Sequence, residues 1–373
     1  MEYNSSHITV GGKRFHYIWL RDNCLTRECR HPTSFQKIYD ISELTETPKP
    51  LNVELTNDEL IIDWDEKPPH RSIFPLPWLM IHAYDETGGI SDFHIKNELR
   101  KQQEILWDSA WIEAHTPEKH DFHTSDRQAW VNQLYALGFA VIKNMPLAEL
   151  DNFISSIGPI HYTEGGRIFT VKSKLGANDI ADTDYALPPH NDYQSYMYAS
   201  HLLQFLHFVE NKATGGESIL VDGFRVAQDF QRHHPDYFQI LVETPAQFQQ
   251  FYTEWEYYHR RSRQIIELDP KGQVIGVYFG HSHAYNWNIP FDKMENFYAA
   301  YSAFFRYLKS PDYQYRFRLE AGDCLMVQNF RVLHGRTAFD ASSGPRHLEV
   351  AFVAWDYFTG KENFQQFKHL YLI

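Results

Sequence analysis

"CLMVQNF" (Cys324 to Phe330) decides the fold class, because a continuous apolar run of this length is typical of a buried β-strand. Similar short runs recur through the second half of the chain, with only one or two amphipathic helices expected among them. The clearest helix is expected over 293–310. So few helices disfavour a doubly wound nucleotide-binding fold and favour a β-sandwich or jelly roll with flanking helices. The other strand-like runs are "LLQFLHFV" (202–209), "ESILVDGF" (217–224), "GVYFG" (276–280) and "HLEVAFVAW" (347–355).

The first part of the chain has a different pattern, with short alternating strands and a proline-rich break. The run "DRQAWVNQLYAL" (126–137) then has helical apolar spacing and ends at Gly138, a residue suited to a helix C-cap. We therefore expect a small β-rich domain over 1–105 and a second domain over 106–373. The early strand-like runs are "RFHYIWL" (14–20), "NVELTN" (52–57) and "ELIIDW" (59–64), and the break is "EKPPHRSIFPLPW" (66–78).

Composition and charge exclude several function classes. A hydrophobic content of 43% indicates a folded protein. The absence of an apolar run of about 18 residues argues against a membrane span, and the polar start lacks the apolar segment of a signal peptide. A net charge of −13 argues against a nucleic-acid partner. The densest basic run, "HRRSR" (259–263), reads either as a solvated loop or as an anion-binding segment. Three cysteines predict a reducing compartment, and hence the cytoplasm.

Three pairs of the form His-x-Asp or His-x-Glu occur, and one of them has the companions that iron chemistry requires. Non-haem Fe(II) oxygenases hold iron with two histidines and one carboxylate, and residues i and i+2 of an extended strand project the same way. His190 and Asp192 are followed by His334, which ends an apolar strand-like run. The other two pairs are decoys: His234-Pro-Asp236 lies in a polar, helix-like segment, and His347-Leu-Glu349 is adjacent to Arg346, so His347 is expected to support that strand.

The spacing after His334 predicts the cosubstrate site. Arg346 lies 12 positions later, and a guanidinium pairs bidentately with the far carboxylate of 2-oxoglutarate. A hydroxyl in "ATGGESILVDGF" (213–224) would hold the other end of the cosubstrate, with Ser218 or Thr214 as the candidates. The alternative for this segment is a plain Gly-Gly turn into a strand.

Five segments, spread from near the N-terminus to the last strands and including the motifs around His190, His334 and Arg346, resemble the γ-butyrobetaine and trimethyllysine hydroxylases of the taurine dioxygenase-like superfamily. The resemblance implies a double-stranded β-helix (jelly roll) catalytic domain, an N-terminal β domain and often a homodimer. It implies hydroxylation that uses Fe(II), 2-oxoglutarate and O2, with ascorbate as reductant, and that releases succinate and CO2. The carrying motifs are "WLRDNC" (19–24), "HNDY" (190–193), "TGGESILVDGF" (214–224), "NFRVLHGR" (329–336) and "RHLE" (346–349).

The resembled enzymes also carry a structural zinc site in the N-terminal domain. Cys24, Cys29 and His70 supply three ligands here, with His31 as a candidate fourth, while Thr26 stands where a further cysteine is expected. A closed structural zinc site needs four ligands. The alternative is a pair of reduced cysteines in a small β domain.

The resembled enzymes hold a trimethylammonium group in an aromatic cage. Several aromatic residues near the iron motif could form such a cage, and the alternative for each is core packing. They are Tyr162, Phe169, Tyr185, Tyr193, Tyr196 and Tyr198. Tyr193, directly after the ligand pair, is the best candidate for a pocket wall.

By alignment with those enzymes, Asp179 and Asp182 replace amide and aromatic groups. His281 stands where an amide would hold the substrate's acid end, with His283 or a nearby arginine as the alternative. We therefore expect hydroxylation of a small zwitterion, such as a betaine, a quaternary-ammonium phosphonate or a modified amino acid. The alternatives are desaturation or cyclisation on the same scaffold, or a catalytically silent 2-oxoglutarate-binding regulatory module.

Overall fold

The computed structural model describes residues 2–85, 104–173, 177, 179–196, 201–253 and 255–371. It forms two compact units, of which the first comprises 1–100 with 363–373 and the second comprises 101–362. The boundary between the two units, at residue 100, therefore lies five residues before the expected domain boundary at 105. Both units are built on β-sheets, and the chain is mainly β with flanking helices, as predicted.

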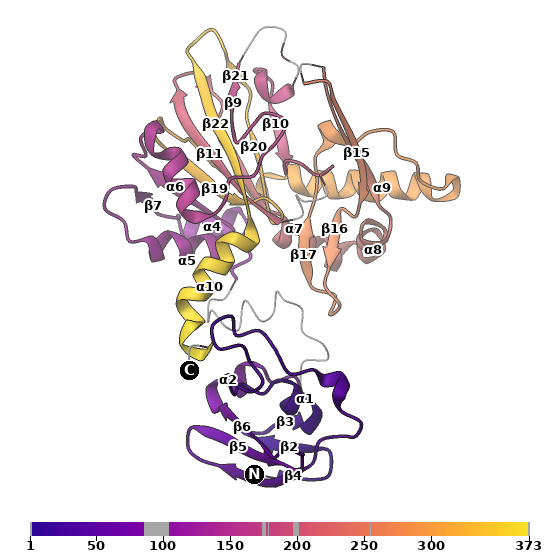
Figure 1. The fold of residues 1–373 in the computed structure, drawn as a ribbon. Helices are drawn as coiled ribbons and strands as arrows, with labels where there is room; N and C mark the ends of the chain where they lie inside the picture. Colours follow the sequence, from indigo (N-terminus) through magenta and orange to yellow (C-terminus); the bar gives the residue numbers. More distant parts are fainter. Residues whose placement is uncertain are drawn as a thin grey trace. The chain divides into compact units, whose positions relative to one another are not determined.

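The larger sheet of the second unit has six strands, and its centre is the long strand β11. All neighbouring strands pair antiparallel except β7 and β8. Figure 1 shows β9, β22, β11 and β19 side by side in this sheet. In spatial order the strands are β7 (Lys119–Asp121), β8 (Phe139–Lys143), β19 (Cys324–Gln328), β11 (Leu202–Asn211), β22 (Arg346–Ala354) and β9 (Ile168–Lys172).

A smaller four-stranded sheet faces the first across an apolar core. Its strands, in spatial order, are β10 (Leu187–His190), β20 (Val332–Arg336), β13 (Ser218–Asp222) and β18 (Gln314–Phe317). Leu220 from this sheet packs with Phe208, Leu325 and Leu348 from the larger one. Every residue of β19 is buried, which explains why its sequence is apolar without alternation.

The helices cover the outer faces and edges of these sheets. The predicted helix over 126–137 is α5 (Arg127–Leu137), which Asp126 caps by accepting from the Gln128 amide. It ends at Gly138, whose φ of 80° favours glycine, and a Cβ there would lie 2.6 Å from Val332. The expectation of one or two helices in the second half was too low. The structure has α7 (Gly223–His233), α8 (Pro235–Glu243), α9 (Phe291–Lys309) and α10 (Trp355–Tyr371) there, and α4 (Ser109–Ala114) and α6 (Leu150–Ile157) earlier.

The smaller elements of the second unit correct one strand prediction. The run "GVYFG" is a strand only as far as Val277, and the segment that follows forms the 3₁₀ turn His281–His283. The remaining strands are short hairpins and a bridge: β12 (Thr214–Gly215) with β21 (Phe339–Asp340), β14 (Ala246–Tyr252) with β15 (Tyr257–Arg263), and β16 (Ile266–Leu268) with β17 (Val274–Val277).

Over residues 2–85, the part of its N-terminal segment that the structure describes, the first unit has two three-stranded sheets and two short α-helices. The prediction for "RFHYIWL" was wrong beyond His16, because Tyr17, Leu20 and Arg21 are buried at helical spacing. The proline-rich break is also structured and contains a strand and a helix. The elements are β1 (Glu2–Tyr3), β2 (His7–Val10), β3 (Lys13–His16), α1 (Tyr17–Asp22), β4 (Pro50–Leu55), β5 (Glu59–Trp64), β6 (His70–Pro75) and α2 (Leu76–Ile81).

Within the described residues, no helix has the length and apolar character needed to cross a bilayer.

Candidate active site

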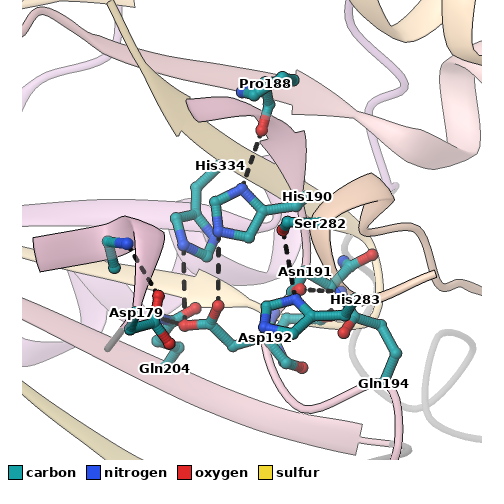
Figure 2. A network of polar contacts seen from close by, with 12 residues as sticks. Asp179, Pro188, His190, Asn191, Asp192, Gln194, Gln204, Ser282, His283 and His334 are labelled. Carbon is teal, nitrogen blue, oxygen red and sulfur yellow. Dashed lines mark hydrogen bonds and ion pairs between the residues drawn. The ribbon is translucent and has the colours of Figure 1, made fainter. Parts of the chain in front are cut away.

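Strand pairing brings the three proposed metal ligands together. His190 ends β10 and lies directly opposite His334 of β20 in the antiparallel register, and the two ring centroids are 4.4 Å apart. Asp192 follows two residues later, with Oδ1 3.5 Å from His190 Nε2 and Oδ2 3.8 Å from His334 Nε2. One ligand atom from each residue can be chosen so that all three lie within 4.8 Å of one another. Figure 2 shows both rings directed toward the carboxylate.

Neighbouring groups fix the orientation of these ligands. His190 Nδ1 lies 2.8 Å from the Pro188 carbonyl oxygen, so this nitrogen donates and Nε2 is left for the site. Gln204 of β11 donates from Nε2 to Asp192 Oδ2 over 2.6 Å. Gln204 is fully buried, and Figure 2 shows it beside the carboxylate. This hydrogen bond holds Asp192 in one orientation.

The local electrostatics favour a metal-binding protonation state at two of the three ligands, His334 and Asp192. Burial and the neighbouring His190 lower the pKa of His334 to about 4. Burial acts to raise the pKa of Asp192, but His334 and His190 outweigh it and hold that pKa below its usual range. At neutral pH the site therefore offers a neutral imidazole and an ionised carboxylate, the forms that bind metals.

Two asparagines clamp the segment that carries the ligands. Asn329 accepts from the Asp192 amide (2.9 Å) and donates to the Asp192 carbonyl (2.8 Å). Asn191 accepts from the Phe279 amide (2.9 Å) and donates to the Asn329 carbonyl (2.7 Å). Asn191 and Asn329 are at most 1% exposed, so these bonds are shielded from water. The backbone of Asp192 is therefore fixed as firmly as its side chain.

The triad opens into a cavity between the two sheets, of about 1170 Å³ including the solvent at its mouth. Its walls come from β9, β11, β19 and β22 on one side and from β10, β13 and β20 on the other. Of the predicted substrate residues, Phe169, Asp179, Asp182 and Tyr193 line it.

Arg346 lines the same cavity from β22 and has no anionic partner among the residues that the structure describes. It is 7% exposed and packs its guanidinium 5.4 Å from the ring centre of Phe208 and 5.6 Å from that of Phe339. Among the described residues, none forms an ion pair with it or accepts a hydrogen bond from its Nε. Burial and the nearby Arg336 lower the pKa of Arg346 to about 9. A cation held here without a carboxylate is suited to bind an anion that enters the cavity.

Three predicted residues lie outside the cavity lining. Thr214 is exposed, whereas Ser218 is buried and lines the cavity, because positive φ at Gly215 and Gly216 breaks the alternation between them. Tyr185 is 69% exposed. His281 turns toward Tyr301, with Nδ1 3.2 Å from its hydroxyl oxygen. The 3₁₀ turn gives residues i and i+2 different directions, and His283 lines the cavity instead.

The other aromatic candidates fall in three places. Tyr196 contacts Tyr193 edge-on, with ring centroids 4.6 Å apart, while Tyr162 is 72% exposed. Tyr198 lies outside the described residues.

In the basic run 259–263, Arg261 donates to the Tyr196 carbonyl and Arg263 is buried over the Tyr278 ring. This run therefore contributes to packing around the site and is not simply a solvated loop.

Several cavity residues were not predicted. Glu164 accepts a hydrogen bond from the Tyr196 hydroxyl, and Tyr252 donates its hydroxyl to Asp179 over 3.0 Å. Gln204 and Arg336 were also missed. A signal for Gln204 was present, because it is one of two polar residues, with His207, in the largely apolar run "LLQFLHF" (202–208). Glu164 lies in a turn and Tyr252 ends the hairpin strand β14, and neither carries a comparable sequence signal.

A second cluster of metal-binding side chains lies in the first unit. Cys24 and Cys29 place their sulfurs 3.3 and 3.5 Å from His70 Nε2. Contact with Cys29 lowers the pKa of Cys24 to about 3, and contact with Cys24 raises the pKa of Cys29. Thr26 Oγ1 lies 3.3 Å from the Cys24 sulfur, while His31 is exposed and accepts from the Thr33 and Ser34 amides. Among the described residues the cluster has three nitrogen or sulfur donors.

Comparison with known proteins agrees with both units. Residues 106–352 match the model of the "Taurine catabolism dioxygenase TauD, TfdA family", and residues 7–80 match "Gamma-butyrobetaine hydroxylase-like, N-terminal". The gamma-butyrobetaine dioxygenase of Pseudomonas sp. (strain AK-1) is 30% identical over 92% of this chain and 88% of its own. The human gamma-butyrobetaine dioxygenase is 27% identical over 91% and 88% of the two chains. The trimethyllysine dioxygenase of Meyerozyma guilliermondii is 27% identical over 94% and 90%.

Two histidines and a carboxylate at the edge of a cavity are the ligand set of non-haem Fe(II) oxygenases, and the family match identifies the class as 2-oxoglutarate-dependent. The chain belongs to the taurine catabolism dioxygenase TauD, TfdA family.

Proposed function

We propose that this enzyme hydroxylates an aliphatic C–H bond of a small zwitterion whose positive end is bound by carboxylates and tyrosines. One observation carries the proposal. The metal-binding triad of His190, Asp192 and His334 lines the same cavity as a buried cation, Arg346, which has no anionic partner among the described residues. The names of the relatives support the substrate class, since gamma-butyrobetaine and trimethyllysine both contain a cationic nitrogen and a carboxylate.

The donor set fits iron, and Arg346 fits 2-oxoglutarate. His190, Asp192 and His334 would hold Fe(II), since two imidazoles and a carboxylate are the ligands that this ion takes in non-haem oxygenases. Arg346 would hold the far carboxylate of the cosubstrate, and Ser218, which lines the cavity, would add a hydroxyl. Iron, 2-oxoglutarate and O2 together supply the oxidation, with ascorbate as reductant and with succinate and CO2 as products.

The protein's own contribution is positioning. Pro188 and Gln204 orient the ligands, and Asn329 fixes the backbone of Asp192. The apolar walls from β11, β19 and β22 keep bulk water away from the reacting C–H bond. A rigid site of this kind directs oxidation to one bond of the substrate.

The charges in the cavity indicate how the substrate would lie. Asp179 accepts hydrogen bonds from the Ala181 amide (2.8 Å) and the Tyr252 hydroxyl (3.0 Å), which fix the orientation of its carboxylate. Glu164, paired with Tyr196, provides a second carboxylate. Tyr193 and Phe169 supply ring faces, which attract cations of any alkylation state. His283, which lines the same cavity, would contact the substrate's acid end.

A substrate panel tests this function. Betaines, amino acids and aminophosphonates are each incubated with enzyme, Fe(II), 2-oxoglutarate and ascorbate, and products are measured by mass spectrometry. We expect a product with one added oxygen atom, formed with an equal amount of succinate, for at least one cationic member. Neutral analogues that lack the nitrogen serve as matched controls. Loss of two hydrogens instead would identify desaturation, and no succinate with any member would contradict the proposal.

We also propose that the first unit holds zinc through Cys24, Cys29 and His70. The convergence of two sulfurs and one Nε2 supports this, because thiolate and imidazole are the ligands of structural zinc. With Thr26 and His31 not contributing, the fourth ligand would come from outside the described residues, and water is the simplest candidate. The metal content is measured by mass spectrometry in the Asp192→Ala variant, so that zinc bound at the iron site does not add to the count.

We expect about one zinc per chain in that background, and a loss of at least tenfold in zinc affinity on His70→Ala. Cys324→Ser is the matched control, because Cys324 is a buried free cysteine of the other unit. Zinc-free protein with its native fold, or equal zinc loss in the control, would contradict the site.

The proposal also covers the fold type of the second unit, the cellular compartment and the oligomeric state. The facing sheets of four and six strands support a double-stranded β-helix (jelly roll) in the second unit. The free cysteines Cys24, Cys29 and Cys324 support a reducing compartment such as the cytoplasm. The family resemblance supports a homodimer, which light scattering of the purified protein tests.

A further inference from the structure

Two buried arginines line the cavity, and they differ in what they bind. Arg346 has no anionic partner among the described residues, as described above. Arg336 is 4% exposed and ends β20, two residues after the ligand His334. Its guanidinium also lies 5.1 Å from the Phe339 ring centre. A buried cation this close to the metal ligands needs a physical explanation, because burial alone destabilises the charge.

The terminal nitrogens of Arg336 are used by one loop of the protein. Nη1 donates to the Ala181 carbonyl over 3.0 Å, and Nη2 donates to the carbonyls of Thr183 and Tyr185, the latter over 3.2 Å. A guanidinium grips a carboxylate through this same fork of nitrogens. The two terminal nitrogens of Arg336 are therefore occupied by backbone acceptors, and only its buried Nε has no hydrogen-bond partner among the described residues. Without a free fork of nitrogens, Arg336 is poorly placed to hold the cosubstrate or the substrate's acid end.

The loop that Arg336 holds, residues 179–185, carries the acidic wall of the cavity. Asp179 and Asp182 both line the cavity, at the two ends of a short turn. Asp182 accepts from the Lys172 amide over 3.2 Å, and Phe339 donates its amide to the Asp184 carbonyl over 3.1 Å. Burial lowers the pKa of Arg336 to about 10, with Asp182 and Asp179 opposing that effect. The loop and the arginine thus attract each other through charge as well as hydrogen bonds.

We propose that Arg336 is a positioning residue that ties the substrate-binding loop 179–185 to the metal-ligand strand β20 and so sets affinity for the substrate's cationic end. It holds Asp179 and Asp182 at a fixed place relative to His334, without contacting cosubstrate or substrate. The part of this inference that concerns the substrate rests on the proposed function, whereas the tie between loop and strand does not.

The chain offers a matched control in Arg318. This arginine donates to three backbone carbonyls of another segment, those of Asn211, Ala213 and Gly215, and it does not line the cavity. Arg318→Met therefore removes the same kind of interaction from a place away from the acidic wall. Arg336→Lys keeps the charge and one potential hydrogen bond, so it serves as the conservative variant if Arg336→Met folds poorly.

Hydrogen–deuterium exchange and 2-oxoglutarate titration together form the test, on full-length protein with Mn(II) in place of Fe(II). In Arg336→Met we expect the amides of residues 181–183 to exchange roughly 10- to 100-fold faster, with a smaller increase in Arg336→Lys. Arg318→Met leaves these amides unchanged. The Kd for 2-oxoglutarate stays within about twofold of wild type in both Arg336 variants. Unchanged exchange would overturn the proposal, and so would a large rise in that Kd, which would make Arg336 an anion ligand.

Steady-state kinetics extends the test to the substrate, with γ-butyrobetaine and 2-aminoethylphosphonate as probes. We expect Arg336→Met to raise the KM of an accepted probe and to increase succinate formed per product, while the KM for 2-oxoglutarate stays constant. A wild-type enzyme that oxidises neither probe would count against the proposed substrate class. The exchange result would still decide whether Arg336 holds the loop.

Discussion

The Asp192→Ala variant is expected to lose iron-dependent turnover, to below about 1% of the wild-type rate, while keeping its fold. Loss of a residue that only supports a metal ligand typically costs 10- to 100-fold in affinity or activity, and a ligand should cost more. Asp192 is the carboxylate member of the triad, and its backbone is held by Asn329 through bonds that the substitution leaves intact. Succinate formation in the presence of Fe(II), ascorbate and a panel substrate measures the effect.

Asp236→Ala is the matched control for this prediction. Asp236 belongs to the decoy pair with His234 and lies in the first turn of α8, away from the cavity lining. Its replacement should cost at most about 1 kcal/mol of helix stability and leave turnover unchanged. Wild-type activity in Asp192→Ala, or an equal loss in Asp236→Ala, would remove Asp192 from the metal site.

The Arg346→Ala variant is expected to raise the KM for 2-oxoglutarate by roughly 100-fold, because truncating one partner of a buried hydrogen-bonded charge pair costs about 2–5 kcal/mol. Since Arg346 has no anionic partner among the described residues, its removal breaks no ion pair in the cosubstrate-free protein. The variant should therefore fold normally and bind iron.

Thermal unfolding separates these effects. At 100 times its Kd, 2-oxoglutarate should stabilise the metal-loaded wild type by about 2.7 kcal/mol, and the same concentration should have little effect on Arg346→Ala. Arg346→Lys should fall between them, because it keeps the charge and loses the bidentate geometry. A KM for 2-oxoglutarate that does not change in Arg346→Ala would assign the cosubstrate anchor to another residue.

The strand-dominated fold and the convergence of the triad could be predicted from the sequence. Buried strands have recognisable apolar runs, and a His-x-Asp pair followed by a distant histidine on such a run has few other structural uses. The register that sets His190 opposite His334 is a consequence of that strand pairing. Arg346 followed from the same logic, because the apolar strand β22 begins with it.

The substrate side of the cavity was less predictable, because irregular segments build it. The 3₁₀ turn at 281–283 exchanges the places expected for His281 and His283, and two glycines with positive φ separate Thr214 from Ser218. Alternation along a strand cannot anticipate either case. The helix Tyr17–Asp22 was mistaken for a strand because its aromatic and β-branched residues favour strands locally, whereas its tertiary contacts bury one helical face.

The most direct test of the iron and cosubstrate assignment is the absorption of the iron–2-oxoglutarate complex, recorded without oxygen. Adding Fe(II) and then 2-oxoglutarate to the wild-type protein should produce a charge-transfer band in the visible region. Asp192→Ala should lack the band, and Arg346→Ala should need roughly 100-fold more 2-oxoglutarate to form it. A wild-type protein without the band, or an Asp192→Ala variant that keeps it at full intensity, would contradict the site described here.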